Sequence, residues 1–307
     1  MFDASHDQAV SHSAKCGDLV YEALVLPASA PAWAHGLVAG LSIAKGSEAL
    51  WNAVTAFEKR ADATFSRELE MALARELDRA EWVALVQDFV ASEITPKGFV
   101  ADWVIHNPHK AADPDAPDQA VYDNPHVHLM HTLRPLHADG FGPKVVRVQD
   151  AGGAPIVIDG KYRYVPFVGG PKELLALRLA WGEVVNRHLK MAGHDIRIDM
   201  RSYADQGVKI TPMTHIGPEP GAMADRLAHT MRSHSVADHA VSRARAAADI
   251  IDNPGALLVK ISRERSTFSD RDIARELYRY VDDATLFGDL LAQIKALPEL
   301  LVVRVDG

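Results

Sequence analysis

The sequence predicts an α+β protein: an antiparallel sheet with helices packed on one face, followed by a small helical region. Two observations support this fold class. Up to about residue 193, apolar stretches with strand and helix periodicity follow one another in the order β-α-β-α-β-β-α. From about residue 223 onward the apolar spacing is mostly helical. We therefore expect a first domain over residues 1–193, a linker over 194–222 and a helical region over 223–307.

The first element expected is a strand over residues 17–27, GDLVYEALVLP, which is rich in Val and Leu and ends at a proline. The stretch PASAPAW that follows predicts a loop. Ser47 is the expected N-cap of the first helix. The apolar residues of this helix recur at helical spacing: Leu50, Trp51, Val54 and Phe57.

A second strand is expected over residues 66–73, SRELEMAL, where alternation places Glu68 and Glu70 on one side. Asp78 and Glu81 have the spacing of a capping box and predict the start of a second helix. The apolar stripe of that helix contains Trp82, Leu85, Val86, Phe89 and Val90.

Two further strands are expected over residues 99–106 and 126–134, joined by a loop rich in Pro and Asp. A long helix should run from about residue 172 to 192, with Gly193 as the residue that ends it. Three prolines interrupt the linker that follows. In the helical region, Ser269 or Asp270 should cap the helix DIARELYRYV.

Composition excludes several classes of protein. The single cysteine, Cys16, cannot form an internal disulfide or a cysteine-based zinc site, so any metal must be held by His and carboxylates. The formal charge of −8 argues against a protein that coats nucleic acid, and DNA binding must therefore depend on a local site. No apolar run is long enough to span a bilayer and the start of the sequence lacks a signal peptide, so we expect no membrane insertion and a cytoplasmic location.

The residues most suggestive of chemistry are His126 and His128, two positions apart on a predicted strand. That spacing aims both rings at one face, with Cα atoms about 7 Å apart. His106 ends the preceding strand, and all three rings can meet if the two strands pair. Three imidazoles would leave coordination positions open, as catalytic metal sites require.

An alternative is that these histidines bind nothing, because a chain with 15 histidines contains such a pair by chance fairly often. The polar residues of both strands lie on the histidine side, which favours a metal site. His131 falls on the apolar side and is interpreted as a packed histidine. Asp102 shares the histidine face, but four strand residues separate it from His106 by about 13 Å.

Longer strings resemble a known family. The motif HNP, a loop and then NPHVHLMHTLRPLHADGFGPK is similar to that of MobA/MobL conjugative relaxases, HUH-fold enzymes that nick one DNA strand. Residues 2–217 share the resemblance, which is strongest to the large relaxases of Ti-type conjugative transfer. Residues 249–307 resemble the first helical piece of their helicase region, although no Walker A string occurs. Supporting matches are GDLVYEALVLPASAPAW, ALWNAVTAFEKRADATFSRELEMAL and AGHDIRIDMRSY.

The resemblance implies a five-stranded HUH sheet and a transesterification in which a tyrosine attacks one phosphodiester at an origin of transfer. The implied partners are single-stranded DNA and other relaxosome and conjugation proteins. The implied cofactor is a divalent ion, and neutral nitrogen ligands suit Mn, Zn or Ni better than Mg. The implied metal ligands are His106, His126 and His128. The candidate bases are Glu68 and Glu70, each of which could instead belong to a solvated edge. The candidate DNA-binding residues are Arg134, Lys144 and Arg147.

One departure from the family concerns the nucleophile. Its first strand and A-Y-R-x-G stretch do not occur here, and the sequence begins MFDASHD at a point just downstream. We expect either a start codon assigned too late or a natural truncation. Tyr21 matches a non-nucleophilic position and Tyr122 lies in a loop. The open alternatives are a nicking-defective DNA-binding remnant and a rolling-circle replication initiator, the latter disfavoured by the APAW and AGHD matches.

Overall fold

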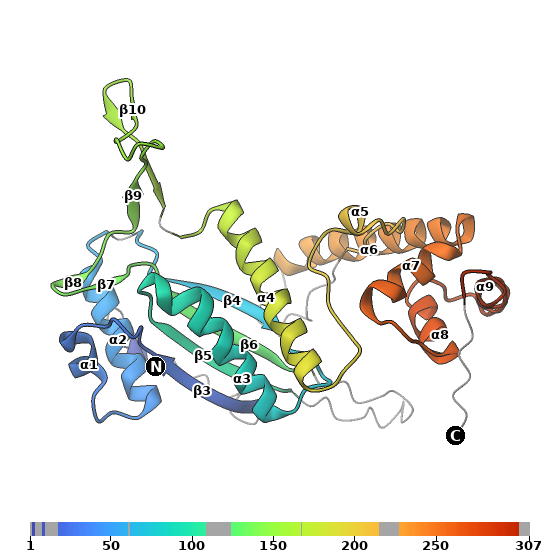
Figure 1. The fold of residues 1–307 in the computed structure, drawn as a ribbon, viewed down its shortest axis with the longest axis horizontal. Coiled ribbons are helices and arrows are strands. Elements are labelled where there is room, and N and C mark those ends of the chain that lie inside the picture. Colours follow the sequence, from blue (N-terminus) through green and yellow to red (C-terminus); the bar gives the residue numbers. More distant parts are fainter. Residues whose placement is uncertain are drawn as a thin grey trace. The chain divides into compact units, whose positions relative to one another are not determined.

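The computed structural model describes residues 2–3, 8–9, 18–60, 62–108, 124–166, 168–214 and 227–300, with the backbone alone for 2–3, 8–9 and 227–236. The chain divides into two compact units, Met1–Ala192 and Gly193–Gly307 (Figure 1). None of the described helices is long and apolar enough to cross a membrane.

The first unit contains a four-stranded antiparallel sheet in the order β3-β5-β6-β4, which confirms the predicted fold class. The strands of this sheet are β3 (Leu19–Val25), β4 (Ser66–Ala72), β5 (Ala101–His106) and β6 (His126–Thr132). Short strands form four antiparallel pairs: β1 (Phe2–Asp3) with β2 (Gln8–Ala9), β7 (Leu136–His137) with β8 (Gly140–Phe141), β9 (Val145–Arg147) with β12 (Tyr164–Pro166), and β10 (Val157–Ile158) with β11 (Lys161–Tyr162). The helices of the unit are α1 (Ala32–Val38), α2 (Ile43–Phe57), α3 (Arg79–Phe89) and α4 (Pro171–Met191); a π turn, η2 (Val90–Ile94), and a 3₁₀ turn, η3 (Thr95–Lys97), follow α3.

One face of the sheet is fully buried along its two central strands, β5 and β6. Alternation on β5 and β6 directs four apolar side chains to this face, and α3 and α4 lie across it (Figure 1). The four side chains are at most 1 % exposed: Trp103, Ile105, Val127 and Leu129. Burying a side chain of this size contributes about 1.5–3 kcal/mol, so these four side chains are a large source of stability for the sheet.

The opposite face carries the histidines and is covered at one end only. His106 and Asp102 of β5 share this face with Met130 of β6. Trp51 of α2 donates its indole N–H to Asp102, and Leu50 packs in the same apolar cluster as Met130. The structure therefore adds a second layer, formed by α1 and α2, to the predicted layer of helices on one face.

Helix boundaries show where local signals succeed. The capping box of Asp78 and Glu81 forms as predicted, and Gly193 follows the end of α4 with φ +84°. The prediction of Ser47 as an N-cap is wrong, because α2 begins at Ile43 and Ser42 accepts a hydrogen bond from the Lys45 amide. Ser47 is instead buried inside the helix. The expected PASAPAW loop also contains the first residues of α1.

The second unit is helical. Its helices are α5 (Tyr203–Gln206), α6 (Leu227–Asp252), α7 (Gly255–Glu264), α8 (Asp270–Tyr278) and α9 (Ala284–Lys295). Ser269 caps α8, as predicted. The predicted linker, residues 194–222, is packed in part, because Val208 and Ile210 are buried in the core of this unit. Residues 215–222 lie outside the described residues. Packing of these two apolar side chains holds the described part of the predicted linker in this unit.

Candidate metal centre

The sheet brings the three predicted histidine ligands together. His106 pairs with His126 across β5 and β6, and His128 lies two residues further along β6 on the same face. The ring centroids of His106 lie 5.6 Å from His126 and 5.3 Å from His128, and those of the latter two lie 5.0 Å apart. One potential ligand atom from each ring lies within 4.8 Å of the others. The arrangement can hold a single metal ion.

Hydrogen bonds orient the rings of His126 and His128. Nδ1 of His128 lies 2.7 Å from Oε1 of Glu68, and Nδ1 of His126 lies 2.7 Å from the carbonyl oxygen of Asn124. When Nδ1–H donates to these acceptors, Nε2 is the nitrogen that each ring can offer to a metal ion. Imidazole nitrogens suit transition-metal ions, so the donor set fits such an ion. The rings are only partly buried, and three ligands leave room for a substrate atom.

The two candidate carboxylate bases differ in their contacts. Both lie on β4 on the histidine face, where Glu68 pairs with Met130 and Glu70 pairs with His128. Glu68 is engaged with the His128 ring although its side chain is 54 % exposed. Glu70 is exposed beside the centre. The structure therefore gives Glu68 an orienting contact, and Glu70 is a second exposed carboxylate on the same face.

Asp102 contacts α2, and its neighbour in the sheet pairing is Met130 rather than one of the three histidines. The Trp51 indole N–H donates to Oδ2 of Asp102 at 2.7 Å. Burial raises the pKa of the Asp102 carboxyl, and hydrogen bonds from Trp51 and Ser47 act in the opposite direction. Asp102 therefore ties the sheet to α2, and sequence reasoning did not find Trp51 as its partner.

Tyr21 lies on the wrong face to reach the centre. Its ring stacks on Trp103 with centroids 5.2 Å apart, and Trp103 points to the face opposite the histidines. Tyr122 lies outside the described residues. His131, interpreted as a packed histidine, is 2 % exposed and contacts Phe99, and burial lowers its pKa.

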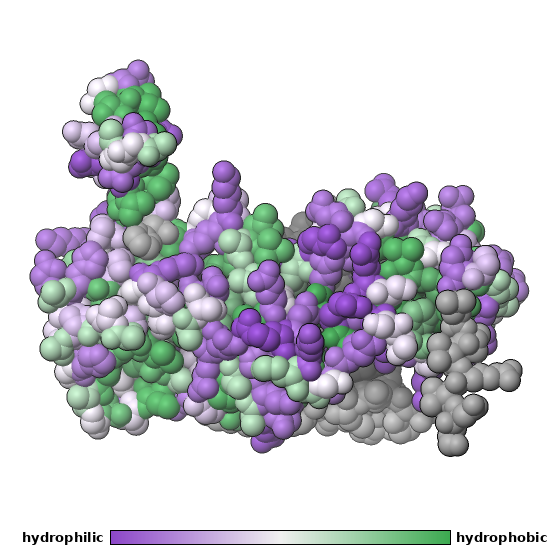
Figure 2. Space-filling model, in the orientation of Figure 1, coloured by the Kyte–Doolittle hydropathy of each residue, from purple (hydrophilic) through white to green (hydrophobic). Residues whose placement is uncertain are grey.

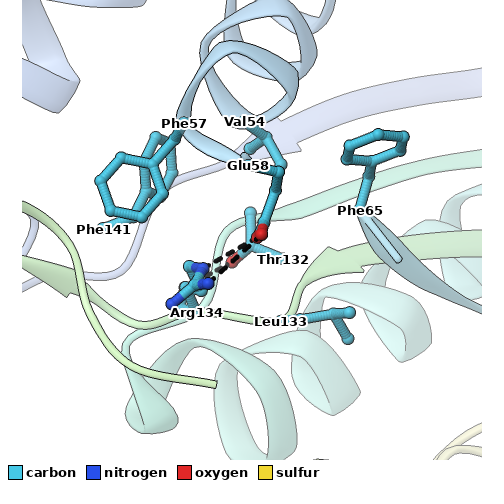
Figure 3. Close-up of a pocket in the computed structure, with 8 residues that line it drawn as sticks. All are labelled: Val54, Phe57, Glu58, Phe65, Thr132, Leu133, Arg134 and Phe141. Carbon is cyan, nitrogen blue, oxygen red and sulfur yellow. Dashed lines mark hydrogen bonds and ion pairs between the residues drawn. The ribbon is translucent and has the colours of Figure 1, made fainter. Parts of the chain in front are cut away.

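Arg134 and Lys144, two of the predicted DNA-binding residues, share one buried carboxylate. Nε of Arg134 and Nζ of Lys144 lie 2.8 Å and 2.7 Å from Oε1 of Glu58, whose side chain is 7 % exposed. Figure 3 shows Glu58 and Arg134 facing each other beside Phe57 and Phe141. The hydrogen bond from Arg134 is the main cause that lowers the pKa of Glu58, with Lys144 acting in the same direction. No sequence motif indicated Glu58.

Arg147, the third predicted DNA-binding residue, lies apart from this ion pair on β9. Its guanidinium carbon lies 4.2 Å from the ring centroid of Tyr162 and 5.8 Å from that of Tyr164. All three side chains are exposed. Arg147 therefore lies against exposed aromatic rings, whereas Arg134 and Lys144 form ion pairs with the buried Glu58.

Taken together, the antiparallel sheet and its three converging imidazoles define an α+β protein with a candidate metal centre on an open sheet face. Residues 1–226 match the MobA/MobL family, and the chain belongs to that family. The resemblance predicted from the sequence is thereby confirmed.

Relatives named as conjugal transfer proteins match nearly the whole chain. It is 40 % identical over 303 residues to "Conjugal transfer protein TraA" of Agrobacterium fabrum, covering 97 % of this chain and 26 % of the relative. It is 41 % identical over 305 residues to "Probable conjugal transfer protein TraA" of Sinorhizobium fredii, covering 96 % and 26 %. The chain thus spans about a quarter of the length of these relatives.

A solved structure titled "Molecular Basis of Vancomycin Resistance Transfer in Staphylococcus aureus" is 25 % identical, with a TM-score of 0.47 and coverage of 66 % of this chain and 84 % of that one.

Proposed function

We propose that this chain is the metal- and DNA-binding part of a conjugative relaxase. In this proposal His106, His126 and His128 hold a divalent ion beside the scissile phosphodiester of a single DNA strand at an origin of transfer. The observation that carries it is the approach of three imidazoles to within 4.8 Å on a sheet face left partly open. Membership of the MobA/MobL family and the names of the conjugal transfer relatives support it. Relaxosome proteins as partners and a cytoplasmic location belong to the same proposal.

The residues around the centre would act by orienting the ligands. Glu68 and the Asn124 carbonyl accept hydrogen bonds from the Nδ1–H groups of His128 and His126, which orients both rings and leaves their Nε2 atoms to bind the ion. A bound ion would polarise a phosphoryl oxygen of the DNA and favour attack at phosphorus. Three nitrogen ligands favour Mn, Zn or Ni over Mg. Glu70, exposed beside His128, is the proposed base that accepts a proton from the attacking group.

A second candidate is a DNA-binding protein that does not cut. Among the tyrosines described in the first unit, Tyr21 lies on the opposite face of the sheet and Tyr162 and Tyr164 lie on β11 and β12, outside the four-stranded sheet. This observation favours binding and positioning of the strand as the contribution of the described residues.

Metal binding is tested on the full chain by calorimetric titration with Mn²⁺. Wild type should bind one equivalent. His126→Ala should lose more affinity than the roughly 10- to 100-fold expected on loss of a mere hydrogen-bond partner. His35→Ala is the matched control, because His35 is exposed on α1. Equal titrations for both variants would remove the proposed centre.

Cleavage is tested with a labelled pool of random DNA single strands. Each strand is about 30 nucleotides long, which is longer than the stretch that one small domain covers. We expect Mn²⁺ to strengthen binding of the pool to wild type and to have little effect on His126→Ala. Denaturing gels then reveal any covalent protein–DNA adduct. An adduct would overturn the non-cutting candidate, and its absence alongside metal-dependent binding would favour that candidate over a nicking enzyme.

A further inference from the structure

An arm formed by residues 145–166 extends from the first unit beyond β8 (Figure 1). Strands β9 and β12 pair near its base, and β10 and β11 pair further out. Asp159 and Gly160 connect β10 to β11 with φ of +49° and +73°, as a two-residue type I′ hairpin turn requires. At a second turn, Oδ1 of Asp150 accepts hydrogen bonds from the Gly152 and Ala154 amides at 2.9 Å each. Turn chemistry therefore defines the shape of the arm.

Apolar side chains cover the arm without a core of their own. Figure 2 shows hydrophobic patches interspersed with hydrophilic side chains over its surface. Small β-ribbons that lack a packed face are marginally stable in water, and clustered exposed apolar side chains often mark a binding surface in soluble proteins. The large apolar side chains that are 37–51 % exposed are Val145, Val146, Val157, Ile158, Tyr162, Tyr164 and Val165.

The charge of the arm indicates which kind of partner would cover it. The arm carries three basic side chains, Arg147, Lys161 and Arg163, and two acidic ones, in a chain whose formal charge is −8. One of the two acids, Asp150, is occupied by the turn. Arg147 lies over the Tyr162 ring, which combines a cation with an exposed aromatic surface. Cations interleaved with aromatic rings are the chemistry that binds phosphates and nucleobases together.

The position of the arm separates it from the histidines. His126 begins β6 and Thr132 ends it, and six strand steps place them roughly 20 Å apart. The chain reaches the arm only after Thr132, through a segment that Arg134 and Lys144 fix to Glu58. DNA bound by the arm would therefore lie several nucleotides from the metal centre.

We propose that the arm binds DNA that flanks the position held at the metal centre, through Arg147, Tyr162 and Tyr164. The proposal deepens the proposed function and depends on it. Exposed rings can stack on unpaired bases, and a β-ribbon is also narrow enough for the major groove of a duplex. Both forms of DNA present the same phosphates and nucleobases. A second copy of the chain is the competing occupant for the apolar strands.

The test compares the full chain with a variant carrying Arg147→Ala, Tyr162→Ala and Tyr164→Ala. Tyr278→Ala is the matched control, because Tyr278 is an aromatic residue of the second unit that is 67 % exposed. Fluorescence anisotropy gives the Kd for a single strand of about 30 nucleotides, for a duplex of the same length and for a strand of about six nucleotides. Circular dichroism melting checks that each variant is folded, and titration with Mn²⁺ checks the metal centre.

We expect the arm variant to bind at least one of the two long probes about 10-fold more weakly or worse, since each stacked base is worth roughly 1–3 kcal/mol. The slope of affinity against salt concentration should also become shallower by the amount expected for about one lost phosphate contact. The six-nucleotide strand and Mn²⁺ should bind as in wild type. The long probe that is affected identifies the single strand or the duplex as the target.

Two results for the arm variant would overturn the proposal for the arm and leave the proposed function intact. The first is unchanged affinity for both long probes with Mn²⁺ binding intact. The second is loss of self-association in sedimentation with DNA binding unchanged. Failure of wild type itself to bind Mn²⁺ and DNA would instead remove the proposed function.

Discussion

Oε1 of Glu68 lies 2.7 Å from Nδ1 of His128, so an edge strand orients a ring that the neighbouring strand contributes to the candidate metal centre. The contact joins residues 60 positions apart in the sequence. It leaves Nε2 available as the proposed metal ligand and gives Glu68 an orienting contact, which differs from the role of a base.

Substitution of Glu68 should weaken metal binding without destabilising the fold. Glu68→Ala removes the acceptor that orients His128, and loss of such a partner lowers metal affinity about 10- to 100-fold. Because the side chain is 54 % exposed, the melting temperature should change little. Calorimetric titration with Mn²⁺ measures the effect, with Glu70→Ala as the control on the same face of β4. Equal losses of Mn²⁺ affinity in the two variants would show that the negative charge of the carboxylates, and not the hydrogen bond to His128, supports metal binding.

Glu58 should make the first unit sensitive to acid. Arg134 and Lys144 lower its pKa in the folded state, so its ion pairs stabilise the fold above the pKa of an unfolded glutamate. This contribution is lost as pH falls through the lowered folded-state pKa. Glu58→Gln should cost about 1–3 kcal/mol at neutral pH and should flatten the acid limb of the stability profile. Urea unfolding at a series of pH values measures both.

A control for Glu58 is the exposed pair of Arg60 and Asp62. Asp62→Asn should leave stability unchanged, because surface ion pairs contribute little. A Glu58→Gln profile that runs parallel to that of wild type at all pH values would contradict the proposed linkage.

Asp102 should make the stability of the first unit depend on pH with a sign opposite to that of Glu58. Burial raises its pKa, so the folded state holds the proton more tightly and ionisation costs stability as pH rises through the raised value. Asp102→Asn keeps an acceptor for the Trp51 indole and removes that cost. The variant should be more stable than wild type at neutral pH and no more stable at low pH. Asp102→Ala should instead lose about 1–3 kcal/mol, because the Trp51 N–H is left without its acceptor. Thermal melts at pH 3 and pH 7, about one unit below and three units above the pKa of an unperturbed aspartate, separate the outcomes.

Removing the buried partner of Lys260 should destabilise the second unit. Its side chain is 4 % exposed and lies 2.8 Å from Glu276 and 2.9 Å from Glu264. Burial alone would raise the pKa of Glu276, but Lys260 offsets this and the pKa is lowered overall. Glu276→Gln leaves a buried cation poorly paired and should cost about 3–5 kcal/mol, whereas Glu264→Gln, at a side chain 43 % exposed, should cost less than about 1 kcal/mol. Hydrogen exchange of the α7 and α8 amides measures the difference. Equal protection in both variants would contradict it.

The sequence predicted the features that depend on local periodicity. Two-residue alternation was enough to place His126 and His128 on one face, and the spacing of Asp78 and Glu81 was enough to identify a capping box. The prediction of Ser47 as an N-cap failed, because the residues before it also have helical spacing and Ser42 offers an equally good cap. A local sequence pattern therefore discriminates only weakly between nearby serines as the N-cap of a helix.

The linear sequence by itself determined the α+β class, the alternation of the histidine strands and the family to which they belong. Only the tertiary structure decided that Glu58 neutralises Arg134, that Trp51 holds Asp102 and that Glu68 orients His128. These partners lie 76, 51 and 60 positions apart. Periodicity is set by the backbone within a few residues, whereas such long-range pairs depend on how the strands and helices pack, which no short pattern encodes.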